Sequence, residues 1–99
     1  MRIYTVTMKT PLGNRKGTLG ISITGNKLDG FLQILKSSNP IIGVIDDNNC
    51  CSFSGHIETA TERLYFLARG VISKDTVVLT LESEDCQYPM TGCAEKEDV

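Results

Sequence analysis

Four cysteines have the greatest chemical potential in this chain of 99 residues, because thiolates bind soft metals and form disulfides. Cys50 and Cys51 are neighbours in an alternating segment, so their side chains point to opposite faces of a strand. Cys86 and Cys93 also take opposite phases. Structural zinc sites usually contain two cysteines separated by two to four residues, and this spacing is absent. We therefore expect no metal and no cofactor.

A disulfide is the remaining possibility for these thiols. Cys51 and Cys86 both have the inward phase and would approach each other if their strands were neighbours. The N-terminal segment lacks the apolar stretch of a signal peptide, which predicts a cytoplasmic protein, where disulfides are rare. We therefore expect the cysteines to be small buried hydrophobic residues.

His56 is the single histidine, and it shares one strand face with Ser52 and Ser54. A catalytic serine needs a base that a third group orients, and the sequence offers neither a suitably placed carboxylate nor a Gly-x-Ser-x-Gly motif. His56 is predicted to be a solvated strand residue rather than a general base or haem ligand. The clustered carboxylates are predicted in or beside turns, where exposure to water accounts for their charge; they are Asp46, Asp47, Glu82, Glu84 and Asp85. We expect no enzyme.

Five cations decide what kind of ligand an interior site would accept, because a carboxylate or phosphate head needs an inward positive charge. All are expected off the apolar phase: Arg2, Arg15, Lys16, Arg63 and Arg69. The polar groups predicted inside are the hydroxyls of Tyr4 and Tyr88. A bound molecule should therefore be small and neutral.

Eight short segments of alternating apolar and polar residues would position these side chains. They are predicted as strands near residues 2–8, 16–24, 27–35, 41–46, 50–58, 63–73, 76–83 and 86–93. Turn residues separate them, including Gly25-Asn26 and Ser37-Ser38-Asn39-Pro40. A helical turn over Asp29–Lys36 remains an alternative for part of the third strand.

One face of these strands is apolar throughout and the other is polar, as in a sheet with one buried side. The inward phase also carries glycines that allow sharp strand bends, namely Gly17, Gly30, Gly55, Gly70 and Gly92. A closed, curved sheet accommodates such bends. We predict an all-β, up-and-down antiparallel barrel in which the segment near Tyr88–Cys93 returns to Arg2–Met8.

Several stretches resemble the calycin-like β-barrels, the superfamily of lipocalins and fatty-acid-binding proteins, and in particular small bacterial domains of that kind. They are Lys9–Leu19, Gly25–Gly30, Phe53–Ile57 and Tyr88–Gly92. The sequence departs from the pattern at Thr59–Glu62, where a second Thr-Pro-x-Gly turn would be expected. The resemblance implies a barrel that encloses one small, mostly apolar ligand.

The chain also aligns with itself at an offset of 49 positions, which brings Met8–Leu32 onto Ile57–Leu81. Apolar residues in the two segments then alternate in the same phase, with a turn at the same place. Two interpretations remain open: an internal duplication, or the general similarity of hairpins that have two-residue turns.

Two functions are compatible with such a barrel. The first is non-enzymatic binding of a small neutral apolar ligand inside. We expect its wall to include the aromatic and sulfur-containing side chains of the inward phase, namely Tyr4, Phe53, Phe66, Tyr88 and Met90. The alternative is a solid core, since a barrel of eight strands can be filled by its own side chains.

The second function is self-association through the outer face. Apolar residues on the outward phase predict an exposed patch, formed by Phe31, Tyr65, Leu67, Val71 and Val78, and Leu35 has the same phase. Symmetric pairing is the commonest way to cover such a patch, so we expect a homodimer. A bulge that reverses the phase of these strands would bury the residues instead.

Composition limits the remaining possibilities. The formal net charge of −2 provides no basic field for nucleic acid, and no stretch is apolar and long enough to predict a membrane helix. The length suits one domain, residues 1–99, with a flexible acidic tail over about 95–99.

Overall fold

Eight antiparallel strands form the protein in a computed structural model, which describes residues 1–58, 61, 63–84 and 86–95. Alternating apolar side chains and short turns make each strand pair with the next. The strands are β1 (Arg2–Thr10), β2 (Gly13–Thr24), β3 (Lys27–Ile34), β4 (Ser37–Ile45), β5 (Cys50–Glu58), β6 (Arg63–Ile72), β7 (Thr76–Ser83) and β8 (Cys86–Ala94).

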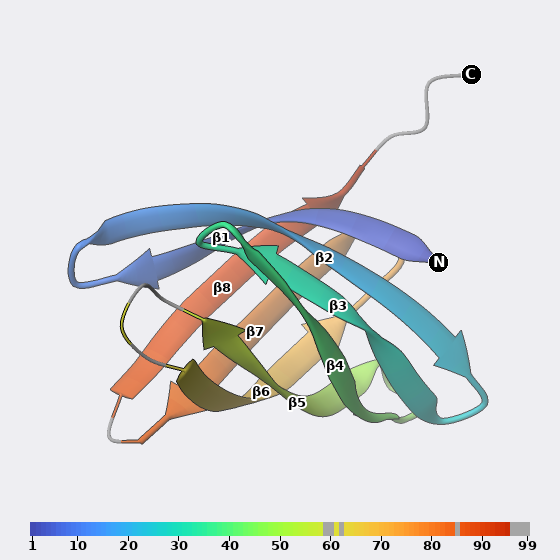
Figure 1. Cartoon of the computed structure of the whole chain (residues 1–99). Coiled ribbons are helices and arrows are strands. Elements are labelled where there is room, and N and C mark those ends of the chain that lie inside the picture. Colours follow the sequence, from blue (N-terminus) through green and yellow to red (C-terminus); the bar gives the residue numbers. More distant parts are fainter. Residues whose placement is uncertain (59–60, 62, 85, 96–99) are drawn as a thin grey trace.

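The sheet closes on itself, because β8 pairs with β1 (Figure 1). This last ladder runs from Tyr4 opposite Ala94 to Met8 opposite Met90. The prediction of an up-and-down barrel of eight strands is confirmed, and the architecture is consistent with a calycin-like fold. Closure leaves no hydrogen-bonding edge between the first and last strands.

The turn between β3 and β4 differs from the prediction. Ser37 to Pro40 were expected to form it, but these residues belong to β4, and the turn consists of Leu35 and Lys36 with φ angles of 53° and 66°. A two-residue turn with positive φ matches the twist of a hairpin. The alternative of a helical turn over Asp29–Lys36 is wrong, because β3 continues to Ile34.

Two glycines permit close approach of neighbouring strands. Gly30 in β3 has a φ of 153°, and a Cβ placed on it would lie 1.9 Å from the carbonyl oxygen of Gly20 in β2. Gly70 in β6 has a φ of 159°, and its Cβ would lie 2.0 Å from the carbonyl oxygen of Val78 in β7. Each bend needs a residue without a side chain.

The barrel is filled at one end. Tyr4 and Val6 of β1 are fully buried, and the Tyr4 hydroxyl donates a hydrogen bond of 2.6 Å to the carbonyl oxygen of Ser73, in the turn between β6 and β7. This bond ties the first strand to the β6–β7 turn at this end of the barrel. Met1 and Glu95, the first and last described residues, lie near the β6–β7 turn at this closed end.

The predicted acidic tail lies partly outside the described residues, which end at Glu95. Glu95 itself is held by β1, since its N–H donates to the carbonyl oxygen of Ile3 over 2.8 Å. Its carboxylate also accepts a hydrogen bond of 3.2 Å from the Thr5 hydroxyl.

The second half of the barrel repeats the first at the offset seen in the sequence. Strands β3 and β4 correspond to β7 and β8 residue for residue, since Lys27 and Ser37 begin the first pair and Thr76 and Cys86 the second. The bent pairs correspond too, because Ile21 lies opposite Gly30 and Gly70 opposite Leu79. The glycine lies on the second strand of the first bent pair, β3, and on the first strand of the second bent pair, β6.

Candidate functional site

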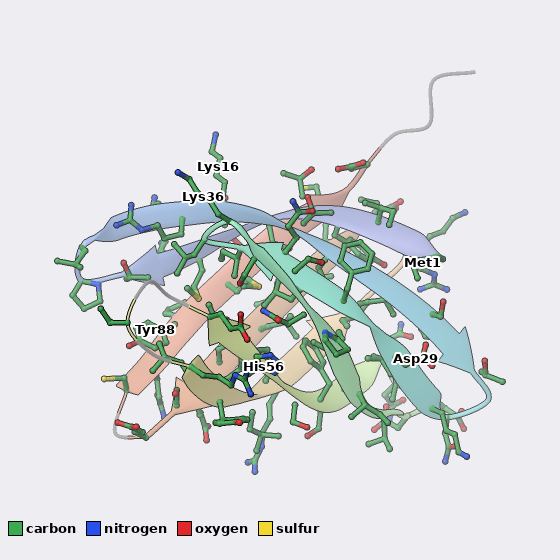
Figure 2. All side chains as sticks on the ribbon, viewed as in Figure 1. Met1, Lys16, Asp29, Lys36, His56 and Tyr88 are labelled. Carbon is green, nitrogen blue, oxygen red and sulfur yellow. The ribbon has the colours of Figure 1, made fainter. Side chains whose placement is uncertain are left out.

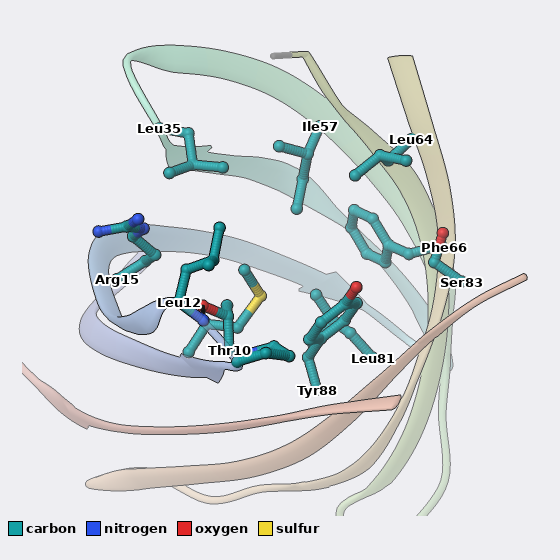
Figure 3. Close-up of a pocket in the computed structure, with 12 residues that line it drawn as sticks. Thr10, Leu12, Arg15, Leu35, Ile57, Leu64, Phe66, Leu81, Ser83 and Tyr88 are labelled. Atoms are coloured by element: carbon teal, nitrogen blue, oxygen red, sulfur yellow. Dashed lines mark hydrogen bonds between the residues drawn. The ribbon is translucent and has the colours of Figure 1, made fainter. Parts of the chain in front are cut away.

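The other end of the barrel is open. A pocket of about 350 Å³ lies between the hairpin turn of β1 and β2 and the strands β5 to β8 (Figure 3). Its lining is mostly apolar and includes Met8, Leu12, Leu35, Ile57, Leu64, Phe66 and Leu81, with Thr10, Pro11, Arg15, Ser83 and Tyr88 around them. A concave apolar surface with a few polar groups is the usual form of a small-molecule site.

The β1–β2 turn shapes the rim of this pocket. The Thr10 hydroxyl donates to the carbonyl oxygen of Gly13 over 2.6 Å and accepts the Leu12 N–H at 3.3 Å. These bonds fix a tight turn whose tip is Pro11 and Leu12. Leu12 is 85% exposed although it is apolar, so part of the rim is exposed hydrophobic surface.

Arg15 contradicts the expectation from the sequence. It lies opposite Met8 in the β1–β2 ladder, and directly paired residues share a face of the sheet. Because Met8 is buried inside, Arg15 has the inward phase at the open end, and its guanidinium borders the pocket. Among the described residues, no carboxylate lies within ion-pair distance of it. Within the part of the chain that the structure describes, the pocket therefore carries a positive charge that no carboxylate pairs with.

Two further polar side chains lie across the pocket from Arg15. The Ser83 hydroxyl donates to the carbonyl oxygen of Tyr65 over 2.7 Å, which occupies its proton and leaves oxygen lone pairs as acceptors. Tyr88 in β8 is half-buried and turns its ring into the pocket (Figure 3).

The structure brings two of the five expected wall residues to the pocket, Phe66 and Tyr88. Tyr4, Phe53 and Met90 are buried deeper in the barrel and do not line it. The rim residues Thr10 to Leu12 were not predicted, because turn residues have no strand phase. Leu35 was assigned to the outward face of the third strand, and this assignment is wrong, since Leu35 lies in the β3–β4 turn and lines the pocket. Arg15 was detectable, since counting in steps of two from Leu19 reaches it.

His56 lies on the outer wall, as expected, with its ring against Tyr65 at a centroid distance of 5.9 Å. Its Nε2 is 3.8 Å from a carboxylate oxygen of Glu58, which also accepts a hydrogen bond of 2.9 Å from Arg63. Hydrogen bonds to Tyr65 and Glu58 raise the pKa of Arg63. No hydrogen bond joins His56 to Ser52 or Ser54 among the described residues, so the geometry assembles no nucleophile.

All four cysteines are free, and only Cys51 is buried. The expected role of a small buried hydrophobic residue is therefore wrong for Cys50, Cys86 and Cys93, which are exposed. Cys51 lies in β5 and Cys86 begins β8, so the two are not on neighbouring strands. Burial, and then the electrostatic effect of the nearby Cys50, raises the pKa of Cys51 to about 11. Its thiol therefore stays protonated and unreactive at neutral pH.

We expect three thiols of the native protein to react with Ellman's reagent at pH 8, and the fourth to react only after denaturation. The slow thiol should disappear in Cys51→Ala but remain in Cys50→Ala. If all four thiols of the native protein react equally fast with Ellman's reagent, Cys51 is not the protected thiol.

The raised pKa of Cys51 also makes the stability of the fold depend on pH. The folded state loses stability between pH 9 and about pH 11, where the unfolded chain ionises this thiol and the folded chain does not.

The outer face carries the predicted apolar residues in part. Tyr65, Val71 and Val78 are 67%, 44% and 58% exposed, and Val71 lies directly opposite Val78. Leu67 is half-buried on the same face. Phe31 lies elsewhere, with its ring packed on Gly20 of β2. Ile42 and Val44 of β4, which were not predicted to belong to the patch, are also exposed.

The described residues contain no group of three or more His, Cys, Asp or Glu side chains that could hold a metal ion. They also contain no helix long and apolar enough to cross a membrane. Comparisons with protein-family models, curated proteins and solved structures find no match to this chain. The geometry of the pocket therefore carries the functional argument.

Proposed function

We propose that the protein is a non-enzymatic binding protein for a small, mainly apolar molecule held in the end pocket. The observation that carries the proposal is an open apolar pocket in a barrel whose opposite end is filled. Its volume of about 350 Å³ falls within the usual range of ligand sites. Methionine, leucine, isoleucine and phenylalanine provide contact area and no reactive group.

The guanidinium of Arg15 at the border of the pocket refines the ligand class. The expectation of a neutral ligand depended on Arg15 lying off the apolar phase, and that assignment is wrong. An apolar body with an anionic group at one end would bury its chain against Met8 and Leu81 and place its charge at the rim. Arginine forms bidentate hydrogen bonds with carboxylates, which favours this head group.

Thermal unfolding with three decyl compounds tests the proposal. Decanoate should raise the midpoint, because a ligand that binds the folded state alone stabilises it. Decanol should raise it less, and decylamine should not raise it, since its cation would face Arg15. No stabilisation by decanoate or decanol in calorimetry would overturn the proposed function.

We also propose that the chain is a calycin-like domain of the small bacterial kind that its turns resemble. The closed barrel of eight antiparallel strands and the pocket at one end support this placement. The support concerns architecture, and one fold can serve many functions.

Self-association is a second candidate function, favoured by the exposed pair Val71 and Val78. Apolar residues that are adjacent across a ladder form a continuous patch, which a second copy would cover. Tyr65 and the half-buried Leu67 extend this patch along β6.

We expect sedimentation velocity at micromolar concentration to show a dimer for the wild type and a folded monomer for Leu67→Lys and Val78→Lys. A charge in the patch would need to be desolvated on association, which disfavours the dimer. Gln33→Lys, on the exposed face of β3, is the matched control and should stay dimeric. A monomeric wild type would exclude the patch as a self-association surface.

A further inference from the structure

The barrel wall is interrupted between β4 and β5. Their ladder runs from Ile45 opposite Cys51 to Ile42 opposite Ser54, although β4 extends back to Ser37 and β5 forward to Glu58. The next hydrogen-bonded pair in the same register would join residues 40 and 56. The strands therefore continue side by side without ladder pairs.

Pro40 explains the interruption. Ile45 donates its N–H to Asn26 on the β3 side, and backbone directions alternate along a strand, so residue 40 faces β5. Proline has no N–H to donate to the carbonyl of His56. Beyond the gap, the Glu58 N–H donates a hydrogen bond of 3.4 Å to the Ser37 hydroxyl oxygen.

A hollow of about 470 Å³ lies over this gap, on the side of the barrel. It is lined by Pro40, Ile41, Ile42, Gly55, Tyr65 and Phe66, with Asp29, Ser54 and His56 around them. In Figure 2, His56 lies between Tyr88 at one end of the barrel and Asp29 toward the other. Most of the lining is apolar, so the hollow suits a hydrocarbon chain.

Phe66 separates this lateral hollow from the end pocket, and its ring borders both. It lies opposite Gly55 in the β5–β6 ladder. A Cβ on Gly55 would be 3.1 Å from Phe66 Cζ and 3.0 Å from Ile41 Cγ2, so the ring extends over the glycine toward β4. An edge-to-face contact with Phe53, at 6.4 Å between ring centroids, supports it from below.

Arg15 and Phe66 lie on opposite sides of the end pocket (Figure 3). A ligand whose anionic group contacts Arg15 would direct its apolar end toward Phe66. We propose that Phe66 sets the maximum length of the ligand, because its ring closes the end pocket where the wall is interrupted. This inference rests on the proposed function, and its occupant is the far end of the same ligand.

A series of straight-chain carboxylates tests the proposal by calorimetric titration: hexanoate, octanoate, decanoate and dodecanoate, each below its micelle concentration. Every additional buried methylene tightens binding about fourfold. Wild-type affinity should rise along the series and then level off. In Phe66→Ala the rise should continue for at least one further member, which there binds about tenfold or more tightly than it binds the wild type.

Two other variants make the readout specific. Leu79→Ala also truncates a buried apolar side chain, but Leu79 lines neither hollow, so the chain length at which affinity levels off should stay unchanged. Phe66→Leu keeps most of the volume and serves if Phe66→Ala does not fold. It should move the limit in the same direction by a smaller step.

The outcomes separate this inference from the proposed function. If the wild type binds none of the carboxylates, both are overturned. If the wild type binds them and neither Phe66 variant changes the length limit, Phe66 does not set ligand length, whereas the end pocket remains the binding site. Equal shifts in Leu79→Ala would assign the effect to general loosening of the core and also overturn the inference.

Discussion

Gly30→Ala is expected to destabilise the folded protein more than any exposed substitution, by about 3 kcal/mol or more. The added methyl group would lie 1.9 Å from the Gly20 carbonyl oxygen and 3.2 Å from the Ile21 Cα, both backbone atoms that cannot rotate away. The φ of 153° adds conformational strain for a residue with a Cβ. Relief would require β2 and β3 to separate at their bend. Urea unfolding followed by circular dichroism measures the loss.

Gly25→Asn is the control for this prediction. Gly25 also has a positive φ, 64°, but a Cβ there meets nothing within 4 Å, and asparagine tolerates that region of φ. We expect its free energy of unfolding to change by less than about 1 kcal/mol. Gly70→Ala should behave like Gly30→Ala, because its Cβ would lie 2.0 Å from the Val78 carbonyl oxygen. A stable Gly30→Ala would show that the bend relaxes without cost.

The strand pattern was predictable because a period of two is strong in this sequence. Seven of the eight strands both begin and end within a few residues of the predicted bounds, and the exception is β4, which begins at Ser37. A Ser-Ser-Asn-Pro sequence is typical of a turn, and local propensity gives no reason to extend a strand through it. Pairing with β3 overrides that propensity, since Ile34 lies opposite Ser37.

The proline was misleading for a related reason. In a fully paired strand Pro40 would leave a carbonyl without a donor, so its presence argued against a strand. The structure tolerates it because the ladder toward β5 stops at Ile42. Pro40, which disfavours a strand in the sequence, is therefore the residue at which the ladder between β4 and β5 is interrupted. The alternation of apolar and polar residues along the sequence does not show this.

The pocket was harder to predict than the core. Inward phase identifies which side chains point inside, but not how far along the barrel axis each one lies. Tyr4 and Tyr88 both have the inward phase, yet Tyr4 is fully buried at the closed end and Tyr88 borders the open one. Depth depends on the stagger between strands, which the ladders fix and the alternation does not.

Arg15→Glu is expected to weaken decanoate binding about tenfold, while decanol binding stays within about twofold of the wild type. The substitution replaces the positive charge at the rim of the pocket with a negative one, and one tenfold step corresponds to about 1.4 kcal/mol. The effect is limited because an exposed charge is screened by water and salt. It should therefore shrink as ionic strength rises. Calorimetric titration at low and high salt measures both ligands.

Lys16→Glu provides the matched control for Arg15→Glu, because it makes the same change in net charge at the next position of β2. Lys16 lies opposite Thr7 on the outward phase and does not line the end pocket. If Lys16→Glu weakens decanoate binding as much as Arg15→Glu does, the effect comes from net charge and the carboxylate does not contact Arg15. If only Arg15→Glu acts, and only on decanoate, the guanidinium at the rim selects the anionic end of the ligand.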